Sequence, residues 1–262
     1  MPSDGPPLIE LERISVMRGE TVVLHELSLR IGVGEHVAIL GPNGCGKSTL
    51  IKTITRECYP LLRDGARMSI FGKEVWNVFD LRPLLGVMSN DLMASCTRDI
   101  TGRETVLSGF FSSIGIEPYH VVTPELEDHA REILELLEIP HLADRPVSEM
   151  SSGEAKRVVL GRALVHNPRA LVLDEPTNSL DLFAQYELRE IMRKLANSGI
   201  GIILVTHHLA DVIPEIERVI LMRDGAIVAD GPKPEILNAA TLGDLFGIPV
   251  DLAQRDGYYH LW

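Results

Sequence analysis

The stretch GPNGCGKST, at Gly41–Thr49, restricts the possible fold of this 262-residue chain more than any other segment. It fits the pattern G-x-x-x-x-G-K-[ST], follows the short apolar run VAIL and precedes the helical segment STLIKTIT. A buried strand that enters a helix through a glycine-rich loop turns successive backbone N–H groups inward, where the helix dipole adds positive potential. This arrangement predicts a phosphate-binding loop in a nucleotide site.

Every residue of this loop is a candidate nucleotide contact. Lys47 supplies a point charge for the β and γ phosphates, Ser48 offers its hydroxyl to Mg²⁺, and Thr49 offers one on the α-phosphate side. Cys45 is interpreted as a small residue that is tolerated because the backbone does the binding. The expected contacts in the loop are Gly41, Pro42, Asn43, Gly44, Cys45, Gly46, Lys47, Ser48 and Thr49.

Two further apolar runs end in residues that suit phosphate chemistry. The run ALVLD ends at Asp174, which Glu175 follows, and the run GIILVT is followed by His207. Ligands of open α/β sheets gather beyond the carboxyl ends of the strands. We therefore expect Asp174 to hold Mg²⁺ through water and Glu175 to orient and deprotonate an attacking water. His207 is expected to touch the γ-phosphate, whereas His208 is interpreted as an ordinary surface or hydrogen-bonded residue.

The stretch MSSGE, at Met150–Glu154, opens a segment that reads as a helix and ends before Asn167–Pro168. Ser151 and Glu154 stand three residues apart, a spacing that predicts a capping box. The exposed N–H groups of a helix start also attract anions. Both interpretations stay open on this stretch alone.

The remaining pattern favours strand–loop–helix units with a helical insert. An antiparallel pair is expected over residues 8–32, further strands at 67–72 and 84–90, and mostly helices over 91–165. In the clearest helix, 124–139, the residues expected on one buried face are Ile133, Leu134, Leu136, Leu137 and Ile139.

Near the C-terminus we expect a hairpin about Asp224–Gly225, helical character over 234–246 and a second hairpin about Asp256–Gly257. The predicted fold class is α/β, with a phosphate-loop core on a mostly parallel sheet, an N-terminal antiparallel β subdomain and a helical subdomain.

Composition narrows the setting and the partners. The net charge of −12 disfavours a nucleic-acid partner, since such binders usually carry a basic surplus. The sequence has no run of 18 apolar residues to span a bilayer and no signal-peptide profile at its start. Cys45, Cys58 and Cys96 form no metal or disulfide pattern, which favours a reducing cytoplasm.

Taken in order, the phosphate loop, MSSGE, LVLDEP, NSLD and VTH resemble the motifs of the ATP-binding-cassette (ABC) ATPase family. MSSGE is similar to the LSGGQ signature of that family, and Asp181 in NSLD matches its D-loop. The resemblance implies one cassette over residues 1–262. Its expected parts are a nucleotide-binding core (1–90 and 166–232), a helical subdomain (91–165) and a small C-terminal extension (233–262).

In that family two cassettes pair head to tail, and each signature completes the nucleotide site of the other. The resemblance therefore implies that Ser151 and the Gly153 N–H face a γ-phosphate held by Lys47 of a second copy. Ser152 and Glu154 complete this signature, and the capping box turns the carboxylate of Glu154 away from the phosphates. Both interpretations of MSSGE then hold together.

Two positions depart from the family pattern. Arg18 stands where the family has an aromatic ring that stacks on adenine; its planar guanidinium can also stack, which leaves base selectivity open. Asn90 falls where the family has the Q-loop glutamine, and it is a candidate Mg²⁺ ligand with one carbon less of reach. The alternative that Asn90 is only a loop residue stays open.

The function implied by the resemblance is the ATPase subunit of a membrane transporter, with ATP and Mg²⁺ as cofactors. Its implied partners are a second copy of itself and a separate transmembrane permease; an extracytoplasmic solute-binding protein is a further candidate. The expected place is the cytoplasmic face of the cell membrane. The single cassette and its C-terminal segment resemble importers of metal chelates or oxyanions. The alternative is a soluble ABC ATPase that acts as a mechanical switch in a non-transport process.

Overall fold

The chain is organised around a six-stranded sheet in a computed structural model that describes residues 5–262. The strand order is β5-β6-β7-β3-β8-β9, in which the first five strands run parallel and β9 pairs antiparallel with β8. The strands span β3 Val37–Leu40, β5 Leu85–Met88, β6 Ala170–Asp174, β7 Gly201–Thr206, β8 Arg218–Arg223 and β9 Ala226–Pro232. The mostly parallel sheet and the hairpin at Asp224–Gly225 are thereby confirmed.

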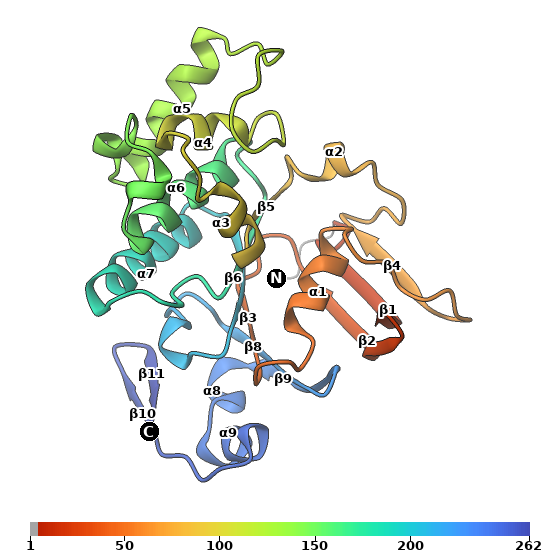
Figure 1. Cartoon of the computed structure of the whole chain (residues 1–262). Coiled ribbons are helices and arrows are strands. Elements are labelled where there is room, and N and C mark those ends of the chain that lie inside the picture. Colours follow the sequence, from red (N-terminus) through yellow and green to blue (C-terminus); the bar gives the residue numbers. More distant parts are fainter. Residues whose placement is uncertain (1–4) are drawn as a thin grey trace.

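A second, antiparallel sheet in the order β2-β1-β4 covers one face of the central sheet together with helix α1 (Figure 1). Its strands are β1 Ile9–Arg18, β2 Thr21–Ile31 and β4 Arg67–Ile70, and α1 spans Lys47–Ile54. Val37 and Ile39 of β3 pack into this layer, whereas Ala38 and Leu40 face the opposite core, as the period of two in a strand requires. The antiparallel N-terminal unit is confirmed.

The helical lobe is built from α3 Asn90–Cys96, α4 Gly102–Ser108, α5 Pro124–Leu136 and α6 Ser152–Leu164. Its helices α4 and α5 lie at the top of Figure 1. Short 3-10 turns lie at Pro140–Leu142 and Val147–Glu149, and α2 (Val78–Leu81) precedes the lobe. The expectation of mostly helices over 91–165 is confirmed, with an interruption at residues 109–123, which form turns and irregular chain.

The expected apolar face of α5 is also wrong at one position. Ile133, Leu134, Leu137 and Ile139 are buried, but Leu136 is 51% exposed. Successive residues of a helix are rotated by ~100°, so Leu136 turns out of the arc that buries its neighbours.

Helix α7 (Leu182–Asn197) follows β6 and was missed in the sequence analysis. Its buried residues Leu188, Ile191, Met192 and Leu195 follow the spacing i, i+3, i+4 and i+7 that marks an amphipathic helix. The pattern was therefore present in the sequence.

The C-terminal segment contains α8 (Lys233–Ile236), α9 (Ala239–Phe246) and the hairpin of β10 (Leu252–Arg255) and β11 (Tyr258–Leu261). The hairpin about Asp256–Gly257 is confirmed. The helical stretch expected over 234–246 is split into two, because the Asn238 side chain caps α9 by accepting from the Thr241 N–H at 2.9 Å. No helix within residues 5–262 is long and apolar enough to cross a membrane.

Candidate active site

Three adjacent parallel strands carry the predicted polar groups to one edge of the central sheet. β3 enters the phosphate loop, β6 ends at Asp174, and β7 lies between them and leads to His207. The sequence expectation that these three strand ends lie together therefore agrees with the strand order.

The phosphate loop folds tightly around the side chain of Lys47, which is only 6% exposed. The Lys47 Nζ donates to the carbonyl oxygens of Gly41 at 2.7 Å and Pro42 at 3.1 Å. A Cβ on Gly41 would lie 2.3 Å from the carbonyl oxygen of Met222, so this position requires glycine. An ammonium held in place by the carbonyls of a glycine-rich loop is suited to bind the terminal phosphates of a nucleotide.

A pocket of ≈ 290 Å³ lies in front of this loop. Nine of the 19 predicted site residues line it, and Val23 and Asn178 join them. The predicted residues that line the pocket are Asn43, Gly44, Gly46, Lys47, Ser48, Thr49, Asn90, Glu175 and His207. Asn178 stands inside the NSLD motif, which was its signal in the sequence; Val23 had none.

Four of the predicted nucleotide contacts, Gly41, Pro42, Cys45 and Arg18, do not line the pocket. Gly41 and Pro42 hold Lys47 through their carbonyls, and Cys45 is buried behind the loop, where burial raises the pKa of its thiol. Arg18 ends β1 and is exposed.

Asn90 is the first residue of α3, not a loop residue, and lines the same pocket as Ser48. Its helix is capped by Ser89, whose Oγ accepts from the Leu92 N–H at 3.3 Å. The cap at Ser89 fixes where α3 begins, and its first residue, Asn90, lines the pocket.

Glu175 is held in place by contacts on every side. Its N–H donates to the carbonyl of Val205 at 2.8 Å, and its Oε2 accepts from Thr206 Oγ1 at 3.1 Å. Its Oε1 is hydrogen-bonded to His207 Nδ1 at 2.8 Å and lies 3.9 Å from Lys47 Nζ. The backbone of Glu175 has φ +50, a region that non-glycine residues rarely adopt and that is common at functional sites.

Asp174 precedes this carboxylate at the end of β6 and is 8% exposed. Burial, and next the neighbouring charge of Glu175, raise the pKa of Asp174 to about 6. Two carboxylates held side by side in low dielectric repel each other, and a cation relieves that repulsion. The pair therefore fits the hard-cation role expected of Asp174.

The signature segment forms the predicted capping box. Ser151 Oγ accepts from the Glu154 N–H at 3.3 Å, and Glu154 Oε2 accepts from the Ser151 N–H at 2.8 Å. These hydrogen bonds lower the pKa of Glu154. Ser151 and Ser152 are exposed, and the segment lies outside the pocket of its own chain.

The D-loop residue Asp181 is exposed as well and caps α7 by accepting from the Ala184 N–H at 2.8 Å. Gly153 lies against the same turn, since a Cβ on it would meet the Cβ of Ala184 at 2.8 Å. The signature segment therefore packs against the start of α7, which the D-loop residue Asp181 caps.

Lys156 was missed in the sequence analysis, although it is a lysine on the buried side of α6 and only 6% exposed. Its Nζ donates to the carbonyls of Pro176 at 2.8 Å and Asn178 at 2.6 Å, and lies 3.4 Å from that of Glu175. It therefore ties the signature helix to the chain that follows the catalytic candidate Glu175.

A tight phosphate loop with acidic groups and a histidine on neighbouring strand ends defines a phosphate-loop nucleoside triphosphatase. The family model described as ABC transporter matches residues 24–178, which is more than half of the chain. The chain belongs to this family, and it is an ATPase of the ABC type. The family resemblance and the fold class expected from the sequence are confirmed.

Individual relatives match over nearly the whole chain. The hemin import ATP-binding protein HmuV of Hahella chejuensis is 32% identical over 253 residues, covering 92% of this chain and 93% of that protein. The structure of cbiO1 from Clostridium perfringens, described as part of the ABC transporter complex cbiONQ, has a TM-score of 0.76 at 26% identity and covers 90% of this chain and 93% of its own. The dimeric structure of MJ0796, described as a bacterial ABC transporter cassette, has a TM-score of 0.70 at 25% identity and covers 86% and 98%.

Proposed function

We propose that this chain is the ATP-binding and ATP-hydrolysing subunit of an importer, in which ATP pairs two copies head to tail and thereby drives a separate transmembrane permease. One observation carries the proposal: the pocket of each chain holds Lys47 and Glu175, whereas its signature at Ser151 is exposed outside that pocket. A site that is complete only with the signature of a second copy makes hydrolysis depend on pairing. The dimeric description of a similar cassette supports this.

In this mechanism the residues of the chain have distinct roles. Lys47 and the loop N–H groups bind the phosphates, and Glu175 accepts a proton from the attacking water. His207, hydrogen-bonded to Glu175 Oε1 at 2.8 Å, orients that carboxylate and contacts the γ-phosphate. Bound Mg²⁺ would neutralise developing phosphate charge, with Ser48, Asn90 and Asp174 as the residues that would hold it, Asp174 through water.

The signature then acts on the second copy. Ser151 Oγ and the Gly153 N–H face the γ-phosphate bound by the other subunit, together with Ser152, while Glu154 stays folded back in its capping box. Asp181 lies on the same exposed surface and bridges the paired sites. Retention of the box leaves positive potential, not a carboxylate, at the helix start that meets the phosphate.

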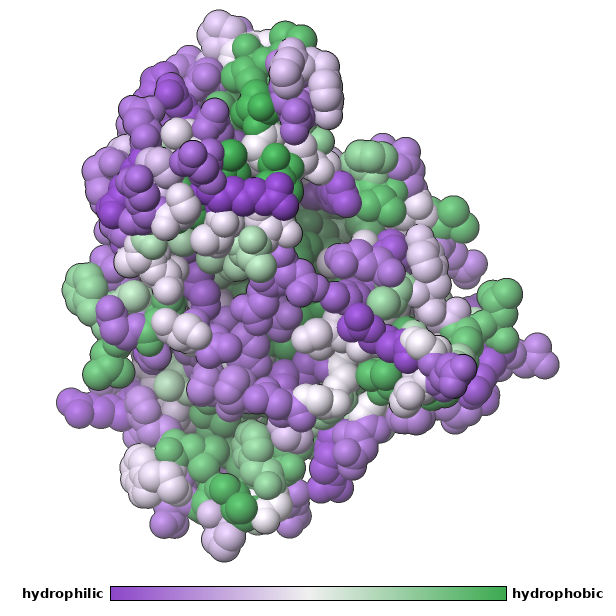
Figure 2. Space-filling view, in the orientation of Figure 1, coloured by the Kyte–Doolittle hydropathy of each residue, from purple (hydrophilic) through white to green (hydrophobic). Residues whose placement is uncertain are grey.

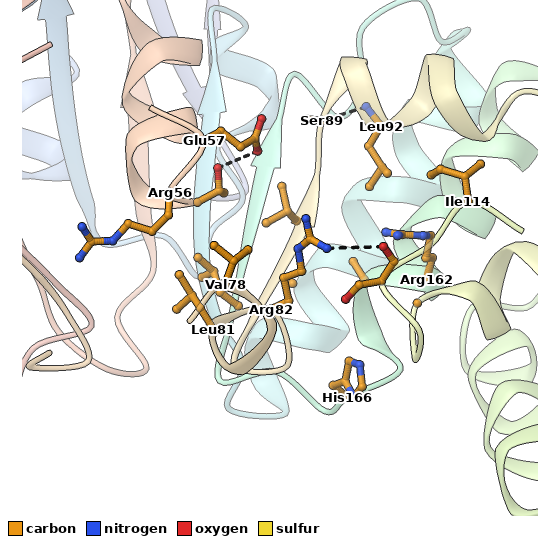
Figure 3. Close-up of a pocket in the computed structure, with 17 residues that line it drawn as sticks. Arg56, Glu57, Val78, Leu81, Arg82, Ser89, Leu92, Ile114, Arg162 and His166 are labelled. Carbon is orange, nitrogen blue, oxygen red and sulfur yellow. Dashed lines mark hydrogen bonds between the residues drawn. The ribbon is translucent and has the colours of Figure 1, made fainter. Parts of the chain in front are cut away.

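A groove of ≈ 530 Å³ is the proposed contact with the permease. Figure 3 shows Val78 and Leu81 of α2 on one side, and Ile114 and Arg162 of the helical lobe on the other. Figure 2 shows a hollow with hydrophobic residues at its floor between the helical lobe and the part that carries α2. Apolar walls and an arginine fit a short amphipathic helix with an acidic residue.

The cargo proposed is a metal chelate, because a relative covering nearly the whole chain is named for hemin import. If the protein belongs to an importer, a solute-binding protein is a further expected partner. Its expected location is then the cytoplasmic face of the membrane. A soluble ABC ATPase that works as a mechanical switch is the alternative. Co-purification of a membrane protein from detergent extracts separates the two.

Pairing is tested with Glu175→Gln, which keeps the shape of the side chain but removes the base. With MgATP this variant is expected to accumulate as a dimer in light scattering, and adding Ser151→Arg is expected to return it to monomer with ATP still bound. Ser198→Arg is the matched control and keeps the dimer, because Ser198 lies at the C-terminal end of α7, ~24 Å by helix rise from the Asp181 end that packs against the signature. A Glu175→Gln, Ser151→Arg variant that dimerises as fully as Glu175→Gln alone would refute the signature role.

A further inference from the structure

His208 has no role in the proposed mechanism, yet its ring lies directly beside His207. The two ring centroids are 3.8 Å apart with an angle of 40° between the planes. In an extended strand, consecutive side chains point to opposite faces. Here β7 has ended, and the His208 N–H donates to Thr206 Oγ1 at 3.0 Å, a local turn that brings both imidazoles to one side.

Both rings also lie close to the catalytic candidate Glu175. One carboxylate oxygen of Glu175 and one ring nitrogen from each histidine all lie within 4.8 Å of one another. The carboxylate is held by Thr206 Oγ1 on its other oxygen at 3.1 Å, so it is oriented before any ligand arrives. An oriented carboxylate with two imidazoles is the His₂Glu donor set of open zinc sites.

We propose that Glu175, His207 and His208 bind a Zn²⁺ ion, and that this ion blocks hydrolysis. Tetrahedral Zn²⁺ with bonds of ~2.1 Å separates its ligand atoms by ~3.4 Å. The 2.8 Å between His207 Nδ1 and Glu175 Oε1 must therefore widen by ~0.6 Å, and the His208 nitrogen must move inward. Side-chain rotations supply such shifts, because His207 is only half-buried and His208 is exposed.

The site differs in chemistry from the Mg²⁺ position of the same pocket. The residues assigned to Mg²⁺ are Ser48, Asn90 and Asp174, which offer oxygen atoms, whereas imidazole nitrogen favours Zn²⁺ over Mg²⁺. A cation close to this site is Lys47, whose Nζ lies 3.9 Å from Glu175 Oε1 and is held by two loop carbonyls. Its charge weakens the zinc site and keeps it reversible.

Bound Zn²⁺ would block hydrolysis because it occupies the lone pair of the Glu175 carboxylate. Zn²⁺ on the carboxylate of Glu175 removes the acceptor for the proton of the attacking water and draws His207 away from the γ-phosphate. Glu175, His207 and Lys47 also line the ≈ 290 Å³ phosphate pocket. Nucleotide and Zn²⁺ therefore compete for the same space. This inhibitory part rests on the proposed ATPase mechanism, whereas binding of the ion does not.

The test compares His208→Gln with His141→Gln, a matched substitution of an exposed histidine in the helical lobe. Tag-free, chelator-treated protein is titrated with Zn²⁺ by calorimetry in excess Mg²⁺ and without nucleotide. We expect His208→Gln to weaken one site by ~10-fold or more and His141→Gln to leave it unchanged, since loss of a ligand costs at least as much as loss of its hydrogen-bonding support. Equal zinc affinity in His208→Gln and the wild type overturns the proposal.

Hydrolysis is then measured at buffered free Zn²⁺. His208 lies outside the wall of the phosphate pocket, so His208→Gln is expected to hydrolyse ATP normally in chelator and to need ~10-fold more Zn²⁺ for half-inhibition. Unchanged half-inhibition overturns the inhibitory role. A wild type that is inactive even in chelator refutes the proposed ATPase mechanism, while the calorimetric titration still decides whether the zinc site exists.

Discussion

Replacement of Lys156 by methionine tests whether the signature helix and the chain after Glu175 are held together by one buried charge. Methionine is close to lysine in shape and restores the apolar contacts of the stem, but it has no donor. The carbonyls of Pro176 and Asn178, now 2.8 and 2.6 Å from the Lys156 Nζ, lose that donor, the first in a buried contact and the second in a partly buried one.

The expected loss of stability is large. A buried acceptor left without its partner costs about 1–3 kcal/mol, and a hydrogen bond to a charged group contributes about 1.5–3 kcal/mol. Part is recovered because the ammonium no longer has to be desolvated, the effect that lowers the pKa of Lys156. The net decrease in the free energy of unfolding is about 2–4 kcal/mol, because two carbonyls lose their donor but no unpaired charge is left behind, and Tm falls by roughly 5–15 °C.

Activity should fall in a particular way. Lys156 does not line the phosphate pocket, so the KM for ATP stays close to the wild-type value, whereas kcat falls because the chain that positions Glu175 is loosened. Urea denaturation and steady-state hydrolysis measure the two effects.

Lys194→Met is the control, since Lys194 forms an exposed ion pair with Glu138 and its loss is expected to change stability far less than loss of the Lys156 contacts. A Lys156→Met protein as stable as Lys194→Met, with unchanged kcat, would refute this role for Lys156.

Three further outcomes are expected. Gly225→Ala places a Cβ 2.1 Å from the Val23 carbonyl at a residue with φ +76, whereas Gly199→Ala, at φ +94, places its Cβ in open space. In urea denaturation, Gly225→Ala should therefore destabilise the chain clearly more than Gly199→Ala. Equal effects of the two substitutions would contradict the steric reasoning. The pKa of Asp174 is about 6 in the folded chain against an ordinary value of 3.8, so the folded state binds this proton more tightly than the unfolded state. Titration of Asp174 therefore makes the metal-free protein less stable as pH rises from about 4 to 6, and Asp174→Asn should lose this part of the pH dependence. An identical pH dependence of stability in Asp174→Asn would count against the raised pKa. Maleimide labelling of Cys45, buried behind the phosphate loop, should abolish hydrolysis and be slowed by MgATP, with mass spectrometry confirming the site; full activity of labelled protein would remove Cys45 from the site.

Much of the candidate site could be predicted because its parts are local in sequence. The phosphate loop is nine consecutive residues between a strand and a helix, and its function depends on backbone N–H groups that the loop itself orients. The capping box joins Ser151 and Glu154 within one helical turn, so its hydrogen bonds form without help from the rest of the fold. The hairpins at Asp224–Gly225 and Asp256–Gly257 likewise follow from turn residues flanked by strands.

The features that the sequence patterns did not predict depend on packing between distant segments. Leu136 and the chain over 109–123 follow from how the helical lobe packs, which the apolar pattern of one segment does not specify. The same holds for Lys156, whose acceptors stand about 20 residues away in the sequence. A buried lysine is stable only if carbonyl oxygens accept hydrogen bonds from its ammonium group. No local sequence pattern predicts that the carbonyls of Pro176 and Asn178 lie close to Lys156.

By itself the sequence determined the chemistry of each group: a phosphate loop, a strand end with Asp174 and Glu175, and a histidine after the next apolar run. Only the tertiary structure decided which of these groups meet. Parallel strands β6, β7 and β3 lie side by side although up to 160 residues separate their sequences, and this order brings His207 Nδ1 to 2.8 Å from Glu175 Oε1. The physical reason is that the side-chain period and turn preferences are local, whereas strand order is set by burying both faces of the whole sheet at once.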